Sequence, residues 1–211
     1  QRFINSGFDN IMGRSNGLVH RKMTAISFNI LGEPFQPFIY GQSSFPLQMA
    51  LKYKIPLIMD GENAEIEYGG DSIQETASGL DLEGMLKYFQ SGMGIEEWKK
   101  YGFSDQQLEF YRPPSIDEIN NLKIKHHFFS TYIKWIPQEN YYYAAEHTGF
   151  QVNPAGRSEG TYSKYSSLDD KTDGFHYYMS FIKFGIGRAT SDAAHEIRDG
   201  HLTREEGAVL V

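Results

Sequence analysis

The spacing of apolar residues predicts two helices in the first quarter of the chain. From Arg21 to Leu31 apolar side chains recur at helical spacing, and Gly32 followed by a proline predicts the end of this helix. The serines at 43 and 44 are suited to cap a second helix that carries Pro46 in its first turn. The pattern therefore predicts a helix that begins just after residue 44.

Two short apolar runs predict buried strands. Ile55 to Met59 follows the second helix and precedes a polar loop at residues 60–63, while His127 to Trp135 is aromatic and β-branched. A proline at 137 and a glycine at 149 predict the bounds of a further helix. Residues 68–121 between the strands are polar and are interpreted as a helical insertion. The pattern thus predicts two β–α units of a parallel sheet, separated by that insertion.

Three pairs of residues predict helix N-termini. In each pair a serine or threonine stands three residues before a glutamine or glutamate, which is the spacing of a capping box. The pairs are Ser104 with Gln107, Ser115 with Glu118, and Thr203 with Glu206. We expect a helix to begin directly after each hydroxyl residue.

The last third of the chain predicts a helical lobe with a charged face. Gly174 to Phe184 carries aromatic residues on every side of a helix, which is typical of a helix that is buried all round. In the following helix, Arg188, Asp192 and Glu196 lie at four-residue spacing. Such a ladder is usually a surface feature, and only a buried position would indicate a function.

Composition narrows the classes of function. The 211 residues include 27 acidic and 20 basic side chains, for a net charge of −7, so nucleic acid is not an expected partner. Without cysteine the chain offers no thiolate zinc ligand and no cysteine nucleophile. No apolar run approaches the length of a membrane span, so no membrane partner is expected and a cytoplasmic location is the default. The chain begins with Gln1, and we interpret it as a C-terminal fragment of a longer protein.

Three features offer candidate chemistry, each with a structural alternative. The loop at residues 60–63 carries carboxylates and an amide that could hold a ribose or a substrate amide, or it is an ordinary turn with solvated acids. The stretch at residues 157–173 mixes cations, carboxylates and rings, which suits an acidic sugar, or it is a solvated connection. His176 is the best-placed residue for proton transfer, although a hydrogen-bonded core histidine is the commoner outcome. The histidines lack a paired spacing, so no metal site is expected.

Four long runs resemble one enzyme family. The runs IPLIMDGENAEIEYGGD, KWIPQENYYY, GRSEGTYSKYSSLDDKTDGFHYYMSFIKFGIGRATSD and AHEIRDGHLTREEG are similar to the N-acetyl sugar amidotransferases. This family belongs to the pyrophosphatase-loop ATP superfamily and includes the enzymes that form acetamidino groups on pseudaminic acid and O-antigen sugars. The similarity extends from about Pro34 to the end of the chain.

The resemblance implies a fold and a reaction. It implies an α/β fold with a partial Rossmann-like parallel sheet of the adenine nucleotide α-hydrolase type, a helical insertion and a helical C-terminal lobe. Residues 1–150 would be the C-terminal part of the nucleotide-binding domain and residues 151–211 the substrate-binding region. ATP with Mg²⁺ would activate the acetamido carbonyl of an N-acetylated acidic or nucleotide-linked sugar, and ammonia would then replace AMP. The ammonia would come from glutaminase and cyclase-like partner subunits.

The resemblance also implies roles for individual residues. The residues expected at the nucleotide and the activated amide are Gly61, Glu62, Asn63 and Glu67. Glu62 and Asn63 are catalytic candidates, together with His176, which its place on the predicted helix suggests independently of the resemblance. The residues expected at the sugar are Trp135, Arg157, Glu159, Tyr162, Lys164, Asp170, Arg188 and Asp192. The chain departs from the family in one respect, because the N-terminal Ser-Gly-Gly-x-Asp-Ser loop that would cradle pyrophosphate is missing from it. We therefore expect this chain alone to use ATP poorly, and the alternative hypothesis is a non-catalytic module that binds sugar or docks a partner.

Overall fold

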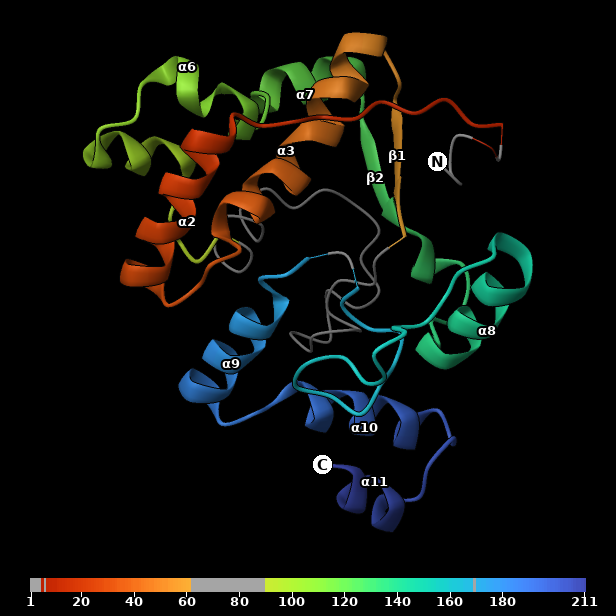
Figure 1. Ribbon diagram of the computed structural model, residues 1–211. Coiled ribbons are helices and arrows are strands. Elements are labelled where there is room, and N and C mark those ends of the chain that lie inside the picture. Colours follow the sequence, from red (N-terminus) through yellow and green to blue (C-terminus); the bar gives the residue numbers. More distant parts are fainter. Residues whose placement is uncertain (1–4, 6, 62–89, 169) are drawn as a thin grey trace. The chain divides into compact units, whose positions relative to one another are not determined.

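The computed structural model describes residue 5 and residues 7–61, 90–168 and 170–211 (Figure 1). The chain separates into two compact units. The strand unit comprises residues 12–31 and 35–135, and the C-terminal unit comprises residues 1–11, 32–34 and 136–211. The predicted boundary near residue 150 separates a nucleotide-binding part from a substrate-binding part, and this division of function stays a prediction. In the structure, residues 136–211 belong to one compact unit.

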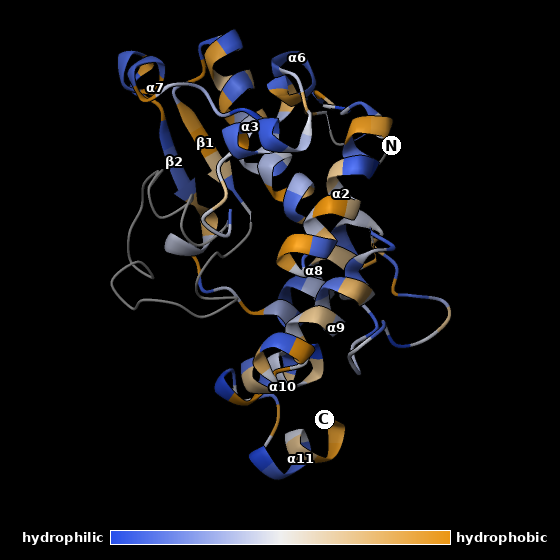
Figure 2. Cartoon of the chain, turned by 90° about the vertical axis from the view of Figure 1, so that its left-hand side faces the viewer, coloured by the Kyte–Doolittle hydropathy of each residue, from blue (hydrophilic) through white to orange (hydrophobic). Residues whose placement is uncertain are grey.

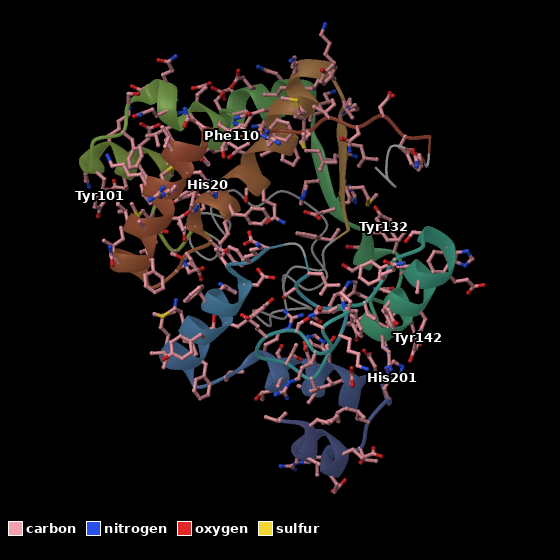
Figure 3. All side chains as sticks on the ribbon, viewed as in Figure 1. His20, Tyr101, Phe110, Tyr132, Tyr142 and His201 are labelled. Atoms are coloured by element: carbon pink, nitrogen blue, oxygen red, sulfur yellow. The ribbon has the colours of Figure 1, made fainter. Side chains whose placement is uncertain are left out.

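The strand unit is built mostly of helices around an aromatic core. Its helices are α2 (Gly17–Leu31), α3 (Gln36–Tyr53), α6 (Asp105–Leu108) and α7 (Ile116–Leu122), with the 3-10 helices η2 (Ile95–Tyr101), η3 (Glu109–Tyr111) and η4 (Phe129–Thr131). Trp98 is fully buried, and its indole N–H donates to the Tyr40 hydroxyl at 3.0 Å. The Tyr111 hydroxyl lies 3.1 Å from Nδ1 of His20, which Figure 3 labels on α2. The core therefore satisfies its polar ring atoms internally.

The predicted end of α2 is confirmed, and its beginning lies earlier than the pattern indicated. Gly32 follows the last helical residue in the left-handed region, with φ +61°. At the other end the Asn16 side chain accepts from the backbone N–H of Leu18 at 3.0 Å and of Val19 at 3.3 Å. Asn16 is therefore the N-cap, which extends the helix one turn before Arg21.

The predicted start of the second helix is wrong. α3 begins at Gln36, with Pro37 in its first turn, so Pro46 lies inside the helix. Ser44 is buried and donates its hydroxyl to the carbonyl of Tyr111 at 2.9 Å instead of capping. Side-chain contacts of this kind hold the helix on both sides of a proline that would break it in isolation.

A parallel pair of strands follows. β1 (Leu57–Asp60) pairs with β2 (Lys125–Phe128) in the register Leu57 to Lys125 through Asp60 to Phe128. The prediction of two parallel strands is confirmed, although β2 begins two residues earlier than expected and residues 129–131 turn into η4. In Figure 2, β1 has mainly hydrophobic and β2 mainly hydrophilic colours. The described structure is thus mixed α/β, and the Rossmann-like extension of the sheet stays a prediction.

The expectation that these strands are buried is wrong for one face of the sheet. Ile58 packs against the cluster of Leu47, Ala50, Ile119 and Ile124 that α3 and α7 form with the strands. Leu57 and Met59, which point to the other face, are each about half exposed. Among the described residues, packing against the strands is therefore seen on the face toward α3 and α7.

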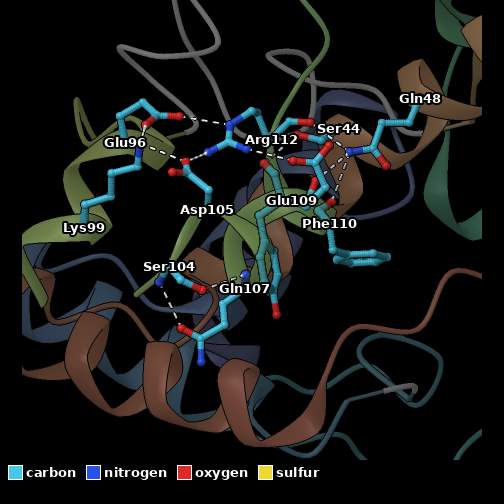
Figure 4. Close-up of polar contacts among 11 residues, drawn as sticks. Ser44, Gln48, Glu96, Lys99, Ser104, Asp105, Gln107, Glu109, Phe110 and Arg112 are labelled. Carbon is cyan, nitrogen blue, oxygen red and sulfur yellow. Dashed lines mark hydrogen bonds and ion pairs between the residues drawn. The ribbon is translucent and has the colours of Figure 1, made fainter. Parts of the chain in front are cut away.

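An ion network holds the helices of the predicted insertion (Figure 4). Arg112 uses all three guanidinium nitrogens, donating to Glu96 at 2.9 Å, Asp105 at 2.7 Å and Glu109 at 2.8 Å. Lys99 also pairs with Glu96 and Asp105. Its hydrogen bonds, followed by those of Arg112, lower the pKa of Glu96. The described part of the insertion, residues 90–121, is helical as predicted.

The C-terminal unit contains four helices in its described residues: α8 (Pro137–Thr148), α9 (Asp173–Phe184), α10 (Arg188–Arg198) and α11 (Arg204–Leu210). The predicted bounds of α8 are confirmed, and Gly149 ends it at φ +66°. All three predicted capping boxes form, at α6, α7 and α11, with both reciprocal hydrogen bonds present in each.

The prediction that α9 is buried all round is wrong. Its helical bounds are close to those expected, yet the rings of Phe175, Tyr178 and Phe184 are 61%, 60% and 72% exposed. Aromatic residues on every side of a helix allow packing on every side. Burial also requires neighbouring helices or strands, which the sequence of the helix itself does not specify. None of the helices in the described ranges combines the length and hydrophobicity that a membrane-spanning helix needs.

Candidate functional site

A hydroxyl-rich loop with its polar residues turned inward forms the base of the candidate site. Ser158, Thr161 and Ser163 are each less exposed than 7%. The backbone N–H of Ser158 donates to the carbonyl of Ser163 at 2.8 Å, and the Ser166 hydroxyl donates to Oγ of Ser163 at 3.1 Å. Because these groups hydrogen-bond one another, a loop without apolar residues at its centre can adopt a fixed shape.

The ladder on α10 joins this loop. Arg188 donates from Nε to Asp192 at 2.8 Å and from a terminal nitrogen to the Tyr177 hydroxyl at 2.7 Å, with its guanidinium 5.0 Å from the Tyr177 ring centre. The Thr161 hydroxyl donates to the other oxygen of Asp192, and Ser167 donates to the Tyr177 hydroxyl at 3.0 Å. We name these five residues the Arg188 cluster.

The Arg188 cluster is largely buried. The side chain of Arg188 is 17% exposed and that of Asp192 is 12% exposed. A mostly buried ion pair at this position differs from the surface ladder that is usual for such spacing. It therefore comes close to the buried position that the sequence analysis named as the sign of a functional role. Its burial makes it a fixed polar floor that holds the loop, α9 and α10 together.

Two tyrosines from the loop lie next to the acidic side of α10. Burial raises the pKa of Tyr162 well above its usual range, and the nearby Glu196 and Asp192 carboxylates raise it further. Burial and the same two carboxylates raise the pKa of Tyr165 to about 12. Both phenols therefore stay protonated at neutral pH and can donate hydrogen bonds.

The Tyr162 hydroxyl is a buried polar atom of special interest. Its oxygen has no hydrogen-bond partner of ordinary geometry among the described residues, although the Glu196 carboxylate is near enough to raise its pKa. Beside it, the Tyr165 ring stacks on Tyr141 of α8, with ring centres 4.7 Å apart and planes within 5°. This part of the site combines a phenol donor with a stacked aromatic pair.

The start of α9 brings two predicted carboxylates together with backbone groups. Asp170 accepts from the N–H and the hydroxyl of Thr172, both at 2.7 Å. Glu159 reaches the first turn of the helix, where a Cβ placed on Gly174 would lie 2.0 Å from its Oε2. Glycine at 174 therefore allows the carboxylate to approach the helix N-terminus, where negative charge is stabilising.

His176 is hydrogen-bonded, as the structural alternative expected, and its partner comes from far away in the sequence. Its Nδ1 lies 2.9 Å from Oε1 and 2.8 Å from Oε2 of Glu33. Glu33 stands in the three-residue segment between α2 and α3 that belongs to the C-terminal unit. No feature of the sequence indicated this pair.

The other residues predicted to contact the sugar lie outside the Arg188 cluster. Arg157 and Lys164 carry exposed side chains on the hydroxyl-rich loop, and the Lys164 carbonyl accepts from the N–H of Asn153 at 2.8 Å. Trp135 is half-buried and lies at the end of the strand unit. Of the sugar residues, the structure therefore brings together Tyr162, Arg188 and Asp192.

The predicted nucleotide loop lies mostly outside the described residues. Glu62, Asn63 and Glu67 fall in the range that the structure does not describe, and Gly61 is exposed directly after β1. At the same end of the sheet, Asp60 lies 3.6 Å from Nε2 of His126. The roles of these residues toward ATP stay predictions.

No group of metal ligands occurs in residues 5, 7–61, 90–168 and 170–211. His195, which the sequence placed loosely near His201, has its Nδ1 2.7 Å from a guanidinium nitrogen of Arg198. His201, labelled in Figure 3, lies 3.9 Å from Glu139. The two histidines thus contact different residues.

Sequence reasoning missed several members of the site. Thr161, Ser167 and Tyr165 stand in the stretch at residues 157–173 that the sequence singled out for its charges and rings, yet spacing alone could not show which side chains turn inward. The sequence did not distinguish Tyr177 from the other aromatic residues of α9. The one sequence feature related to its role is Arg188, its hydrogen-bond partner, which follows eleven residues later on the next helix.

The C-terminal unit therefore combines exposed cations and protonated phenols on its hydroxyl-rich loop with a mostly buried ion pair and a stacked aromatic pair. Guanidinium and ammonium groups bind carboxylates or phosphates, phenols donate to hydroxyl or carbonyl oxygens, and rings pack on the apolar face of a sugar.

Part of the C-terminal unit is similar to a known protein family. Residues 159–211 match the family model of the C-terminal domain of WbpG-like LPS biosynthesis proteins. The matched range contains the whole Arg188 cluster as well as Glu159, Tyr162 and His176. The search of curated proteins returned no match.

Proposed function

We propose that this chain is the sugar-binding part of an ATP-dependent amidotransferase of lipopolysaccharide biosynthesis. The reaction converts the N-acetyl group of a surface-polysaccharide or nonulosonic sugar to an acetamidino group. The similarity of residues 159–211 to the WbpG-like C-terminal domain supports the pathway, and the resemblance of the longer runs supports the type of reaction.

The observation that carries the proposal is the burial of the Arg188–Asp192 pair. A four-residue charge ladder on a helix surface contributes little and needs no partners. Here the pair is mostly removed from solvent and is fixed by Thr161 and Tyr177. Such a rigid polar floor suits a site in which the surrounding side chains must be positioned for a ligand.

The loop and helix residues near the Arg188 cluster have separate roles in the proposal. Arg157 and Lys164 bind the carboxylate or phosphate of the acceptor sugar, because both present cations to solvent from the loop. Tyr162 donates its hydroxyl to a sugar oxygen, since burial keeps the phenol protonated. Glu159 and Asp170 accept from sugar hydroxyls at the start of α9.

ATP is needed because an amide carbonyl is a poor electrophile. Transfer of AMP to the acetamido oxygen turns that oxygen into a good leaving group and releases pyrophosphate. In the proposal Gly61, Glu62, Asn63 and Glu67, which follow β1, face the nucleotide and the activated amide, and Mg²⁺ is held mainly by the phosphates. Ammonia delivered from glutaminase and cyclase-like subunits then displaces AMP.

The test uses the full-length protein that carries this chain. The protein is supplied with ATP, Mg²⁺, an ammonium salt and a panel of acetamido sugars, either free or linked to CMP or UDP. We expect AMP and pyrophosphate to form in equal amounts, together with a product one mass unit lighter than the sugar. If AMP forms with no acetamido sugar of the panel, the proposed reaction is wrong.

A second candidate function is favoured by the missing pyrophosphate loop. In that case the chain is a non-catalytic module that binds sugar or recruits the ammonia-supplying partner. Titration calorimetry on this 211-residue chain separates the two functions. Sugar or partner binding without ATP binding supports the module, while tight ATP binding contradicts it.

A further inference from the structure

The side chains of Glu33 and His176 form a pair but differ in their exposure to solvent. Both carboxylate oxygens lie within 2.9 Å of the same imidazole nitrogen. The Glu33 side chain is 11% exposed, whereas the His176 side chain is 26% exposed. The carboxylate is therefore enclosed, and the ring that it contacts reaches solvent.

This geometry selects one form of the imidazole. An ionised carboxylate only accepts hydrogen bonds, so the nitrogen between its two oxygens must carry the proton. In the neutral ring Nδ1 is then the donor, and Nε2 holds the lone pair. A histidine whose Nδ1–H is held by a carboxylate is oriented for proton transfer at Nε2.

We propose that His176 accepts a proton from the attacking ammonia, and that Glu33 is the residue that positions it. This inference rests on the proposed amidotransferase reaction and adds a residue to it. The location supports it, because His176 immediately precedes Tyr177, which belongs to the Arg188 cluster. The ring of His176 also contacts that of Tyr177, with centres 5.1 Å apart.

The step balances as follows. The nitrogen of ammonia forms a bond to the acetamido carbon that bears the AMP oxygen, and one N–H proton passes to Nε2 of His176. The carbon–oxygen bond then breaks, and its electron pair leaves with AMP. The imidazolium, whose charge the Glu33 carboxylate offsets, returns the proton to the basic amidine, so the products are an acetamidinium group, AMP and neutral histidine.

A purely structural role is the alternative. Glu33 stands next to Gly32, and a Cβ at Gly32 would lie 3.0 Å from the Met179 side chain of α9. The pair could therefore serve only to fasten the connection between α2 and α3 to α9. That role predicts a loss of stability with equal effects on every step of the reaction, and the proton-transfer role predicts an effect on ammonia attack alone.

Kinetics of the two half-reactions separate these roles. Exchange of labelled pyrophosphate into ATP, measured on the full-length protein with sugar but without ammonia, reports activation of the amide. We expect His176→Gln and Glu33→Gln to retain this exchange. Amidine formation with ammonium salt should fall about 10²-fold or more in His176→Gln and about 10-fold to 100-fold in Glu33→Gln. Hydroxylamine, which is less basic and needs less help in losing a proton, should restore much of the rate.

Matched controls and a spectroscopic measurement complete the test. Glu146→Gln removes the carboxylate of an exposed pair, in which Glu146 lies 4.0 Å from His147, and should change neither half-reaction. Nitrogen chemical shifts of labelled histidine in the wild-type protein, assigned through the backbone resonances of that protein, should show the proton of His176 on Nδ1. A proton on Nε2 would overturn the proposal even if the variants failed to fold.

The outcomes also distinguish failure of this inference from failure of the proposed function. If the wild-type protein shows no pyrophosphate exchange with any acetamido sugar, the amidotransferase reaction is wrong, and the proton-transfer role falls with it. If exchange occurs and His176→Gln forms amidine at the wild-type rate, only the role of His176 and Glu33 is wrong. A parallel loss of exchange and amidine formation in Glu33→Gln would indicate the structural role.

Discussion

At the scale of single residues, the Arg188–Asp192 pair decides how the hydroxyl-rich loop is held. Asp192 accepts from both Arg188 and Thr161, so loss of the guanidinium leaves a mostly buried carboxylate without its cation. We expect Arg188→Ala to lower the free energy of unfolding by about 2 to 4 kcal/mol. Chemical denaturation of the single and double variants of Arg188 and Asp192 should give a coupling energy of about 1 to 3 kcal/mol.

Lysine at this position provides a sharper version of the test. An ammonium group can offset the charge of Asp192, but it cannot reproduce the fork that also reaches Tyr177. Arg188→Lys should therefore recover part of the stability, while Arg198→Lys, on an exposed position of the same helix, should be nearly neutral. Equal effects of the two lysine variants would show that the cluster does not anchor the loop.

Arg157 tests the exposed rim of the site. Since its guanidinium is proposed to bind the acidic group of the sugar, Arg157→Ala should weaken sugar binding by about 1.5 to 3 kcal/mol and leave ATP binding unchanged. Titration calorimetry with the two ligands measures both effects on one protein. Equal weakening of both ligands would indicate a folding defect rather than a lost contact.

Gly174 permits a third measurement at this scale. A methyl group there would displace the Glu159 carboxylate from the first turn of α9, which costs about 0.3 to 1 kcal/mol and offsets the gain from replacing glycine in a helix. We expect Gly174→Ala to be nearly neutral alone and stabilising by about 0.5 to 1 kcal/mol in a Glu159→Ala background. Gly17→Ala, whose Cβ would meet no neighbour, should behave alike in both backgrounds.

At the scale of elements, Pro46 stands in the middle of α3 at an exposed position. A proline there cannot donate the helical hydrogen bond and crowds the preceding turn. We expect Pro46→Ala to raise the free energy of unfolding by about 1 to 2 kcal/mol, less than the full cost of an interior proline because proline also restricts the unfolded chain. Pro37→Ala, at the start of the same helix and buried, should lower stability, and a reversed order would contradict this interpretation of α3.

The capping boxes predict a dependence on pH. Hydrogen bonds from the Ser115 hydroxyl and backbone N–H lower the pKa of Glu118 below its ordinary value of 4.5. A carboxyl whose pKa is lowered by folding stabilises the protein above that ordinary value, and this contribution is lost as the pH falls through the lowered pKa. The melting temperature of the wild type should therefore drop relative to Glu118→Gln between pH 6 and pH 3.

The box at α6 is the natural control for this experiment. There Gln107 replaces the glutamate and makes the same reciprocal hydrogen bonds with Ser104. Gln107→Glu should create the pH dependence that Glu118→Gln removes. If the melting temperatures of all three proteins change in parallel with pH, the titration belongs to other groups.

These elements show which features a sequence can predict. The capping boxes, the glycine after α2 and the bounds of α8 were predicted correctly, because each depends on residues within a few positions of one another. Pro46 misled the prediction of α3, since contacts of Ser44 and Gln48 with the segment at 109–112 override the local preference. The exposure of α9 and the partner of His176 depend on distant segments, which periodicity does not describe.

At the scale of the whole molecule, the division into two units does not follow the order of the chain. Residues 32–34 belong to the C-terminal unit although the helices on both sides of them belong to the strand unit. A fragment of residues 136–211 therefore lacks Glu33. We expect α9 in that fragment to exchange its amide hydrogens faster than in the intact chain, as hydrogen exchange would measure. A fragment as well protected as the intact chain would show that the pair adds no stability.

The same arrangement affects the way in which the protein is made. Glu33 leaves the ribosome before His176, which follows 143 positions later, so the carboxylate has no imidazole partner while the segment between them is still being synthesised. Until α9 arrives, a carboxylate destined for the interior remains hydrated, and the connection between α2 and α3 is held only by its own helices. The C-terminal unit is therefore completed only after α9 has been synthesised, although one of its groups lies on the connection between α2 and α3.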